Sequence, residues 1–193
     1  MLASELRELI GEDLYRYFGD RSRSAFFKAW RYEPGFRISF WMRLCRYLST
    51  QGWARIGIYH LARFFHHRIG VKYGVYISFD TEIGGGIYLP HACSIIVNRR
   101  CVIGRDCNLS QGVTLGATNR GERKGNPEIG NRVYVAPGAV IAGRISVGDD
   151  AAIGANAVVV KDVPAKAVVG GIPAKVISLN GSEEYVNHTG SGK

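Results

Sequence analysis

The sequence predicts a mainly β fold, a parallel β-helix of hexapeptide repeats with an N-terminal α-helical cap. The main observation is an aliphatic residue that recurs every six positions over most of the chain after Gly74. The first 73 residues have helical patterns instead, and they carry most of the positive charge. At 193 residues, 46% of them hydrophobic, the chain is long enough to bury a substantial core.

The six-residue period defines the β-helix. An amphipathic helix has a period near 3.6 and a half-buried strand alternates, so neither explains it. In a parallel β-helix each hexapeptide forms a short strand and a corner, and three close one triangular coil of about 18 residues. We therefore predict a β-helix over residues 74–178. The aliphatic runs are Ile77, Ile83, Leu89 and Ile95, then Val97, Ile103, Leu109 and Leu115, then Ile129, Val135, Ile141, Val147, Ile153 and Val159.

Two interruptions of the period are candidate functional insertions, because binding residues concentrate where a rigid scaffold is broken by loops. The first is a slip of two residues between Ile95 and Val97. The second is a step of 14 residues from Leu115 to Ile129. The second could be another slip of two, but its polar, flexible sequence favours a protruding loop over residues 116–127.

Residues 1–73 are predicted to form the helical cap, since solenoids need covered ends. Ser4 is a candidate N-cap for a helix over Ser4–Phe18. Pro34-Gly35 marks a break, after which we expect helices over 36–49 and 54–67. Beyond the β-helix, residues 179–193 are predicted to be a flexible tail.

The net charge of +9 is concentrated in this cap, where 13 Lys and Arg stand against 6 Asp and Glu through Tyr73. Such a surface suits nucleic acid, an anionic membrane or an acidic substrate, or it is simply a solvated helical face. Arg37, Arg43 and Arg46 lie among aromatic residues, which fits a helix resting on lipid headgroups and equally fits helix packing. We expect no nucleic-acid partner.

Other classes are disfavoured. The chain has no apolar run near 18 residues and no secretory signal pattern, so we expect a cytoplasmic protein. Its four cysteines form no C-x-x-C pair, which indicates reduced, mostly buried thiols. A zinc site of three imidazoles, as in β-helical carbonic anhydrases, is excluded by the single histidine in the repeats, and no metal is predicted.

Four segments match a known family in register over about 100 residues: G-I-Y-L-P-H-A (86–92), S-Q-G-V-T-L-G-A-T (110–118), N-P-E-I-G (126–130) and V-P-A-K-A-V-V-G-G-I-P-A-K-V-I (163–177). They resemble hexapeptide-repeat acyltransferases, namely the serine acetyltransferases and their relatives in bacterial polysaccharide clusters. The resemblance implies a left-handed β-helix, a homotrimer, and acetyl-CoA bound in the groove between neighbouring subunits.

The resemblance places the catalytic histidine at His91. A neutral imidazole can accept the proton of an alcohol as that alcohol attacks a thioester, so the residue type suits the chemistry. The other histidines lie on the predicted helices or in the tail. His91 is therefore the predicted general base.

The same resemblance implies a cofactor site with small residues that allow close approach of the backbone, and two lysines for the CoA phosphates. The residues are Gly116, Ala117, Thr118, Ala136 and Ala155, with Lys161 and Lys175. A main-chain N–H around Gly116 or Ala117 is expected to stabilise the tetrahedral oxyanion.

Four positions depart from the serine acetyltransferase pattern. Tyr76 stands where the family has the aspartate that pairs with its histidine, and Pro90 replaces an acidic residue that helps hold the amino acid. Arg99 replaces a glutamate, and Asn126 replaces a second histidine. Either Tyr76 or a main-chain carbonyl is then left to orient His91.

These changes remove the carboxylates that a zwitterionic amino acid needs. We therefore predict an acetyl-CoA-dependent O-acetyltransferase that acts on a sugar or polysaccharide-precursor hydroxyl, in capsule, exopolysaccharide or O-antigen synthesis, with Tyr76, Arg99 and Asn126 near the acceptor. If that acceptor is lipid-linked, the cap would contact the inner face of the membrane. The alternatives are a serine O-acetyltransferase of cysteine biosynthesis and a non-catalytic trimeric scaffold.

Overall fold

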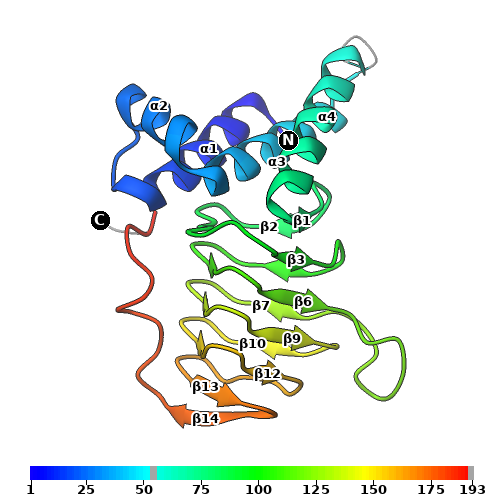
Figure 1. Cartoon of the computed structure of the whole chain (residues 1–193), viewed down its shortest axis with the longest axis vertical. Coiled ribbons are helices and arrows are strands. Elements are labelled where there is room, and N and C mark those ends of the chain that lie inside the picture. The colour runs from blue at the N-terminus through cyan, green and yellow to red at the C-terminus, as the bar shows by residue number, and fades with distance from the viewer. Residues whose placement is uncertain (53–55, 191–193) are drawn as a thin grey trace.

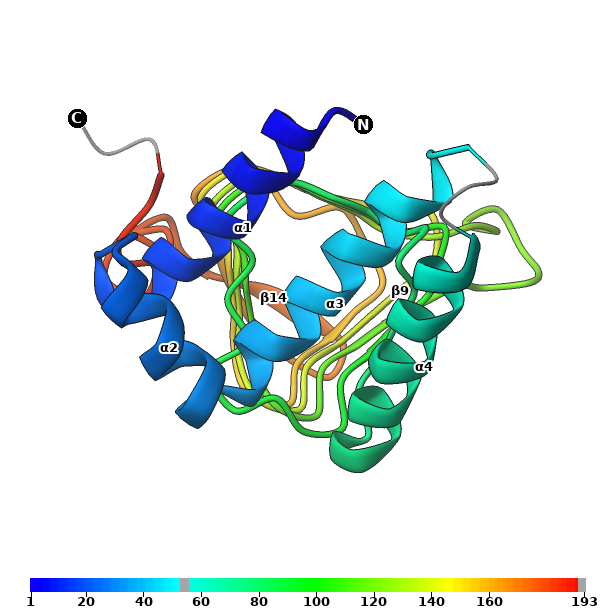
Figure 2. The same ribbon diagram turned by 90° about the horizontal axis from the view of Figure 1, so that it is seen from above.

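The computed structural model describes residues 1–52 and 56–190. In this part of the chain, four helices lie across the open upper end of a β-helix (Figure 1). They are α1 (Ala3–Phe18), α2 (Arg23–Tyr32), α3 (Pro34–Ser49) and α4 (Ile56–Tyr73). Viewed from above, α3 crosses the coil between α1 on one side and α4 on the other (Figure 2).

The β-helix has three sheets, one on each side of the coil. The first sheet contains β1 (Tyr76–Ile77), β3 (Ile96–Val97), β6 (Thr114–Gly116), β9 (Val140–Ala142) and β12 (Val158–Val159). The second contains β2 (Glu82–Ile83), β4 (Val102–Ile103), β7 (Glu128–Ile129) and β10 (Ser146–Val147). The third contains β5 (Asn108–Leu109), β8 (Tyr134–Val135), β11 (Ala152–Ile153), β13 (Val168–Gly171) and β14 (Ala174–Ser178). All pairs are parallel except β13 with β14, a hairpin at the lower end.

The core is the stack of aliphatic residues that the period predicts. Ile103, Leu109, Leu115, Ile141 and Ile153 are each at most 1% exposed. In most strands the residue before the core residue faces outward, so each short strand exposes its first side chain and buries its second. The predicted left-handed β-helix with a helical cap is confirmed.

Both interruptions of the period lie at corners next to the first sheet. Five residues, 90–94, form the corner between Leu89 and Ile95, whereas three residues, 110–112, form the corner below it. The 14-residue step is a loop over residues 117–127 that leaves the coil (Figure 1). Two backbone hydrogen bonds of 3.0 Å between Thr118 and Gly125 close the neck of this loop.

The cap differs from its prediction in three places. Helix α1 begins at Ala3, and its first turn is capped by the Glu5 carboxylate, which accepts from the Leu2 N–H at 2.7 Å, so Ser4 is not the N-cap. Helix α2 was not predicted, because its buried face consists of Ala25 and Ala29 rather than large aliphatic residues. Helix α4 continues to Tyr73 instead of ending at 67, and its predicted start at 54 lies outside the described residues.

Arginines of the cap attach it to the first coil. Arg43 is buried in an ion pair with Asp13 (Nε–Oδ2, 3.1 Å), and its other nitrogens donate to the carbonyls of Ile83 and Gly84 at 2.6 and 2.5 Å. Arg46 donates to the Thr81 carbonyl. The helix-packing alternative therefore holds for Arg43, because its buried side chain cannot reach lipid headgroups. Arg37 donates to the Tyr73 hydroxyl at 3.1 Å. Among the described residues, no helix is long and apolar enough to cross a membrane.

The segment over residues 179–190 is not a free tail. It runs back up beside the third sheet to the cap (Figure 1). Tyr185 stacks on Tyr134 with ring centroids 4.6 Å apart, and its carbonyl accepts from the Asn108 amide at 2.9 Å. Arg16 donates to the Asn187 carbonyl at 2.8 Å. Residues 191–193 of the predicted tail lie outside the described residues.

We expect Asp13→Ala to lower the free energy of unfolding by about 3–5 kcal/mol, because it leaves the buried Arg43 charge without its partner. Urea unfolding followed by circular dichroism measures this. Glu8→Ala is the matched control, since Glu8 pairs with Arg21 at 3.6 Å on the surface and such pairs contribute about 0–1 kcal/mol. Equal losses in the two variants would contradict the structural role of the buried pair.

Candidate functional site

Most of the predicted site residues lie at the two edges of the first sheet. We call the corners through which the chain enters this sheet, residues 90–94, 110–112, 136–138 and 154–156, the upstream edge. The corners through which it leaves, residues 98–101, 117–127, 143–145 and 160–162, are the downstream edge. The strands between these edges are two or three residues long.

His91 lies on the upstream edge, in the five-residue corner. Its side chain is exposed, and within the described chain it has no hydrogen-bond partner. The corner is fixed at its C-terminal end, because the Ser94 N–H donates to the Tyr73 carbonyl at 3.1 Å and the Cys93 carbonyl accepts from the Gly112 N–H at 3.0 Å. The two extra residues therefore hold an imidazole on a rigid support, open to solvent.

The other small residues of the upstream edge lie two and three coils below His91. Ala136 is buried and follows β8, while Ala155 is exposed and follows β11. Both corners have the shorter, three-residue form. The corners below the one that carries His91 are therefore two residues shorter than it.

The downstream edge holds most of the remaining predicted residues. Gly116 ends β6, Ala117 is exposed, and the Thr118 hydroxyl donates to the Arg123 carbonyl at 2.5 Å at the base of the loop. The Asn126 side-chain oxygen is buried without a hydrogen-bond partner among the described residues. Lys161 follows β12 on the same edge, whereas Lys175 lies apart from it, on β14 at the lower end of the third sheet.

One chain therefore holds two half-sites. His91, Ala136 and Ala155 lie on the upstream edge, and Gly116 to Thr118, Asn126 and Lys161 lie on the downstream edge. The first sheet separates the two groups. The structure does not bring His91 together with the predicted cofactor loop within one chain.

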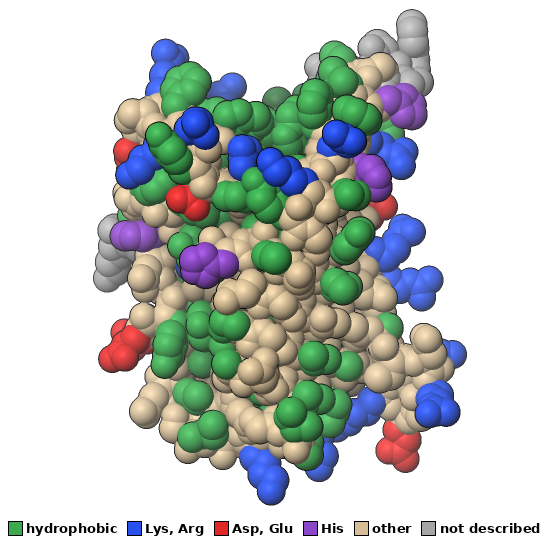
Figure 3. Space-filling view, in the orientation of Figure 1, with side chains coloured by type: hydrophobic (Ala, Val, Ile, Leu, Met, Phe, Trp, Pro, Cys, Tyr) green, Lys and Arg blue, Asp and Glu red, His purple; other side chains and the backbone are tan. Residues whose placement is uncertain are grey.

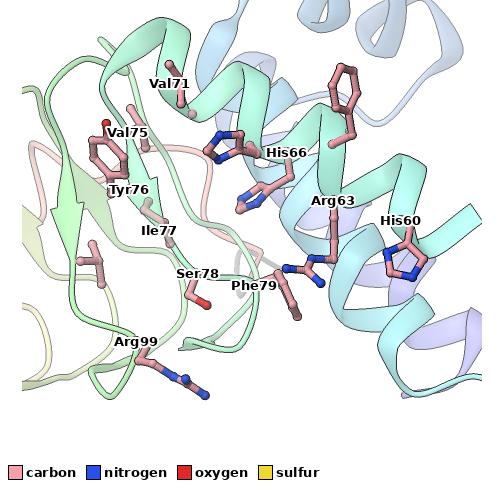
Figure 4. Close-up of a pocket in the computed structure, with 14 residues that line it drawn as sticks. His60, Arg63, His66, Val71, Val75, Tyr76, Ile77, Ser78, Phe79 and Arg99 are labelled. Atoms are coloured by element: carbon pink, nitrogen blue, oxygen red, sulfur yellow. The ribbon is translucent and has the colours of Figure 1, made fainter. Parts of the chain in front are cut away.

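Tyr76 and Arg99 share a third location, a pocket of about 680 Å³ between α4 and the first two coils (Figure 4). Tyr76 is 57% exposed on β1, and within the described chain its hydroxyl makes no hydrogen bond to His91. Arg99 lies in the first corner of the downstream edge and pairs with Asp80 at 3.6 Å. The proposed orienting contact of Tyr76 is thus not made within one chain.

The pocket also contains residues that the sequence analysis missed. Arg63 and His66 project from α4 toward the first coil (Figure 4). The Arg63 guanidinium lies over the Tyr59 and Phe79 rings at 5.5 and 5.9 Å. Burial, with a smaller contribution from nearby His67, lowers the pKa of His66. Arg63 and His66 are three positions apart and so lie on one face of a helix, which is the sequence feature that could have identified them.

The thiols differ in their surroundings. Burial raises the pKa of Cys101 to about 11 and that of Cys107 to about 12, which makes both inert at neutral pH. Cys93 is exposed in the His91 corner and is free. Among the described residues, no three His, Cys, Asp or Glu side chains converge as metal ligands.

The comparisons with known proteins agree with the fold. Residues 126–161 match the family described as "Bacterial transferase hexapeptide (six repeats)". A serine acetyltransferase of Helicobacter pylori (strain J99) is 38% identical over 120 residues, which cover 62% of this chain and 70% of the relative. The chain belongs to the serine acetyltransferase-like hexapeptide-repeat acyltransferases. A serine acetyltransferase of Synechococcus elongatus is 34% identical over 148 residues, or 77% of this chain and 59% of the relative.

Solved structures extend the likeness to the helical cap. A serine acetyltransferase in complex with CoA has a TM-score of 0.73 and 32% identity, covering 91% of this chain and 71% of the other. The Neisseria gonorrhoeae serine acetyltransferase in complex with serine has a TM-score of 0.75 and 29% identity, covering 91% and 70%. The chain spans about three fifths of the length of the first curated relatives, 59% and 61%.

Gly116 offers a test of the cofactor half-site. A Cβ added there would meet nothing closer than a Thr114 methyl at 3.8 Å, so the fold itself has room for alanine. We expect Gly116→Ala to change the free energy of unfolding by no more than about 0.5 kcal/mol. Because the family resemblance places the pantetheine arm here, the KM for acetyl-CoA should rise about tenfold, or about 1.4 kcal/mol of binding.

Gly104→Ala is the matched control for this prediction. A Cβ at Gly104 would lie 2.5 Å from the Gly130 carbonyl oxygen, so alanine should lower the unfolding temperature. If Gly116→Ala keeps a wild-type KM for acetyl-CoA, Gly116 does not approach the cofactor.

Proposed function

We propose that this chain is an acetyl-CoA-dependent O-acetyltransferase with His91 as the general base. The observation that carries the proposal is the solvent-exposed imidazole of His91, which lies on the enlarged corner of the β-helix in a chain that belongs to an acyltransferase family. The CoA complex of a similar serine acetyltransferase supports the donor. The room beside Gly116 and the exposed cation of Lys161 are the features of this chain that suit a pantetheine arm and a phosphate.

The separation of the half-sites supports a homotrimer. If the downstream edge of one subunit lies against the upstream edge of the next, His91 faces the loop and Gly116 of its neighbour. The outward side of the first sheet suits such packing, because Ile96 and Val160 present exposed apolar surface there. The catalytic site would then be completed between chains.

The reaction follows from these groups. His91 accepts the proton of the acceptor hydroxyl as its oxygen attacks the thioester carbonyl of acetyl-CoA. A main-chain N–H around Gly116 or Ala117 stabilises the tetrahedral oxyanion. The C–S bond then breaks, the imidazolium returns its proton to the departing thiolate, and CoA and the acetyl ester are released.

The acceptor has two candidates. Serine is favoured by the comparisons, since the curated relatives and solved structures described above are serine acetyltransferases and one holds serine. The comparisons give no support to polysaccharide synthesis. The sugar hydroxyl remains the second candidate because Tyr76, Pro90, Arg99 and Asn126 stand where the family binds an amino acid or orients its histidine.

His91→Ala should reduce acetyl transfer at least 100-fold, which is the contribution expected of a general base. The measurement is CoA release from acetyl-CoA with L-serine, nucleotide sugars, free sugars and oligosaccharides as acceptors. The oligomer mass and the protection against heat by CoA should remain at wild-type values.

Each outcome has a distinct meaning. Turnover with serine places the protein in cysteine biosynthesis, and turnover with sugars alone selects the second candidate. An active His91→Ala variant would refute the mechanism. Protein that CoA does not protect against heat would instead be the non-catalytic scaffold.

The exposed face of the cap is the proposed contact with an anionic membrane on the cytoplasmic side. Helices α2 and α4 contain six Lys and Arg and no Asp or Glu in their described residues. Phe27 and Phe64 are 70% and 55% exposed among these cations, and Figure 3 shows Lys and Arg gathered over the helices. We expect co-sedimentation with phosphatidylglycerol vesicles at low salt and not with phosphatidylcholine vesicles. No difference between the two would exclude this contact.

A further inference from the structure

The pocket between α4 and the first two coils, the α4 pocket, has an unusual charge. Five of its lining residues are of basic type: His60, Arg63, His66, His67 and Arg99. Among the described residues that line it, none is Asp or Glu. Concave surfaces of one charge sign raise the local concentration of ligands of the opposite sign.

Arg63 and Arg99 carry fixed positive charge, and within the described chain this charge is poorly compensated. The Arg63 guanidinium lies over the Tyr59 and Phe79 rings and forms no ion pair with a described residue. Arg99 pairs with Asp80 at 3.6 Å, but both side chains are exposed, and such surface pairs are weak. The pocket therefore retains positive charge that an anionic ligand can pair with.

The other walls of the α4 pocket suit a ring-shaped ligand. Tyr76 and Phe79 supply aromatic surface from the first coil, and the buried Val75 and Ile77 lie behind them (Figure 4). The volume of about 680 Å³ is within the roughly 300–1,000 Å³ range of sites that hold drug-sized molecules. That is more space than a single amino acid requires.

The end of α4 links the α4 pocket to the corner that carries His91. Gly70 and Val71, near the end of α4, form part of its wall. The Tyr73 carbonyl, two residues further on, accepts the hydrogen bond from Ser94 at 3.1 Å, and Ser94 ends the His91 corner. A ligand in the pocket and the catalytic corner are therefore held by the same turn of helix.

We propose that the α4 pocket holds the anionic part of the acceptor, a sugar that bears a phosphate or a carboxylate. The inference rests on the proposed acetyl transfer and names its acceptor class. Arg63 and Arg99 pair with the anion, and the sugar ring lies against Tyr76 and Phe79. Free serine is a poor ligand here, because its ammonium meets cations and no carboxylate.

Binding of UDP-N-acetylglucosamine and of glucuronic acid, measured by calorimetry on the full chain without CoA, tests the proposal. The two probes separate phosphate from carboxylate recognition. Arg63→Gln combined with Arg99→Gln should weaken the better probe at least tenfold. Arg63→Lys, which keeps the charge, should retain most of the affinity, and Arg21→Gln on the surface of the cap should change nothing.

The outcomes separate this inference from the proposed function. Failure of wild-type protein to bind either probe at millimolar concentration overturns the inference, as does equal affinity in the double Gln variant. Protection against heat by CoA, measured on the same samples, reports on the acetyltransferase proposal alone. If CoA protects and neither probe binds, the acetyltransferase proposal stands and the acceptor class is wrong.

Discussion

The backbone of the first coil is the constraint on which the rest of the structure depends. Each coil of a β-helix pairs with the coils above and below it, so the uppermost coil has polar groups with no coil to bond. Asp13 and Arg43 meet this need together. The carboxylate accepts from the N–H groups of Gly86 and Ile87 at 2.9 and 3.0 Å, while the guanidinium donates to the Ile83 and Gly84 carbonyls. Asp13 and Arg43 thus supply the hydrogen-bond partners that a further coil would have supplied.

The position of the cap in turn determines the candidate site. The docked cap brings the end of α4 against Ser94 and holds the His91 corner from above. It also forms one wall of the pocket that contains Arg63 and Tyr76. Basic residues of the cap thus have two separate roles. Arg16, Arg43 and Arg46 bind the cap to the coil, whereas Arg63 lines the pocket and is available to a ligand.

The β-helix was predictable because its signal is repeated and local. Each aliphatic residue of the six-residue period faces the core, so the pattern needs no knowledge of distant contacts. The cap lacks such a signal. Nothing in the neighbourhood of Arg43 indicates that it is buried against Asp13, 30 residues away, and Ala25 and Ala29 are too small to reveal the buried face of α2.

The candidate site was predictable only in part for the same reason. The family resemblance located His91, and the interrupted period located its corner and the loop. Arg63 and His66 were missed because tertiary packing determines which face of α4 lies against the β-helix. Without knowledge of that opposing surface, a basic residue on a helix is expected to be solvated. The contacts of Tyr185 and Asn187 could not be predicted either, because a polar segment that follows a solenoid has the composition of a flexible tail.

That returning segment changes how the molecule can fold. A solenoid held only by neighbouring repeats can fray from either end and assemble progressively during synthesis. Here Arg16 bonds to the Asn187 carbonyl, 171 residues away, so the first helix is fully secured only after that part of the chain has left the ribosome. Both ends are thereby coupled, and loss of one loosens the other. A contact of this sequence separation is one that stacking between neighbouring repeats does not supply.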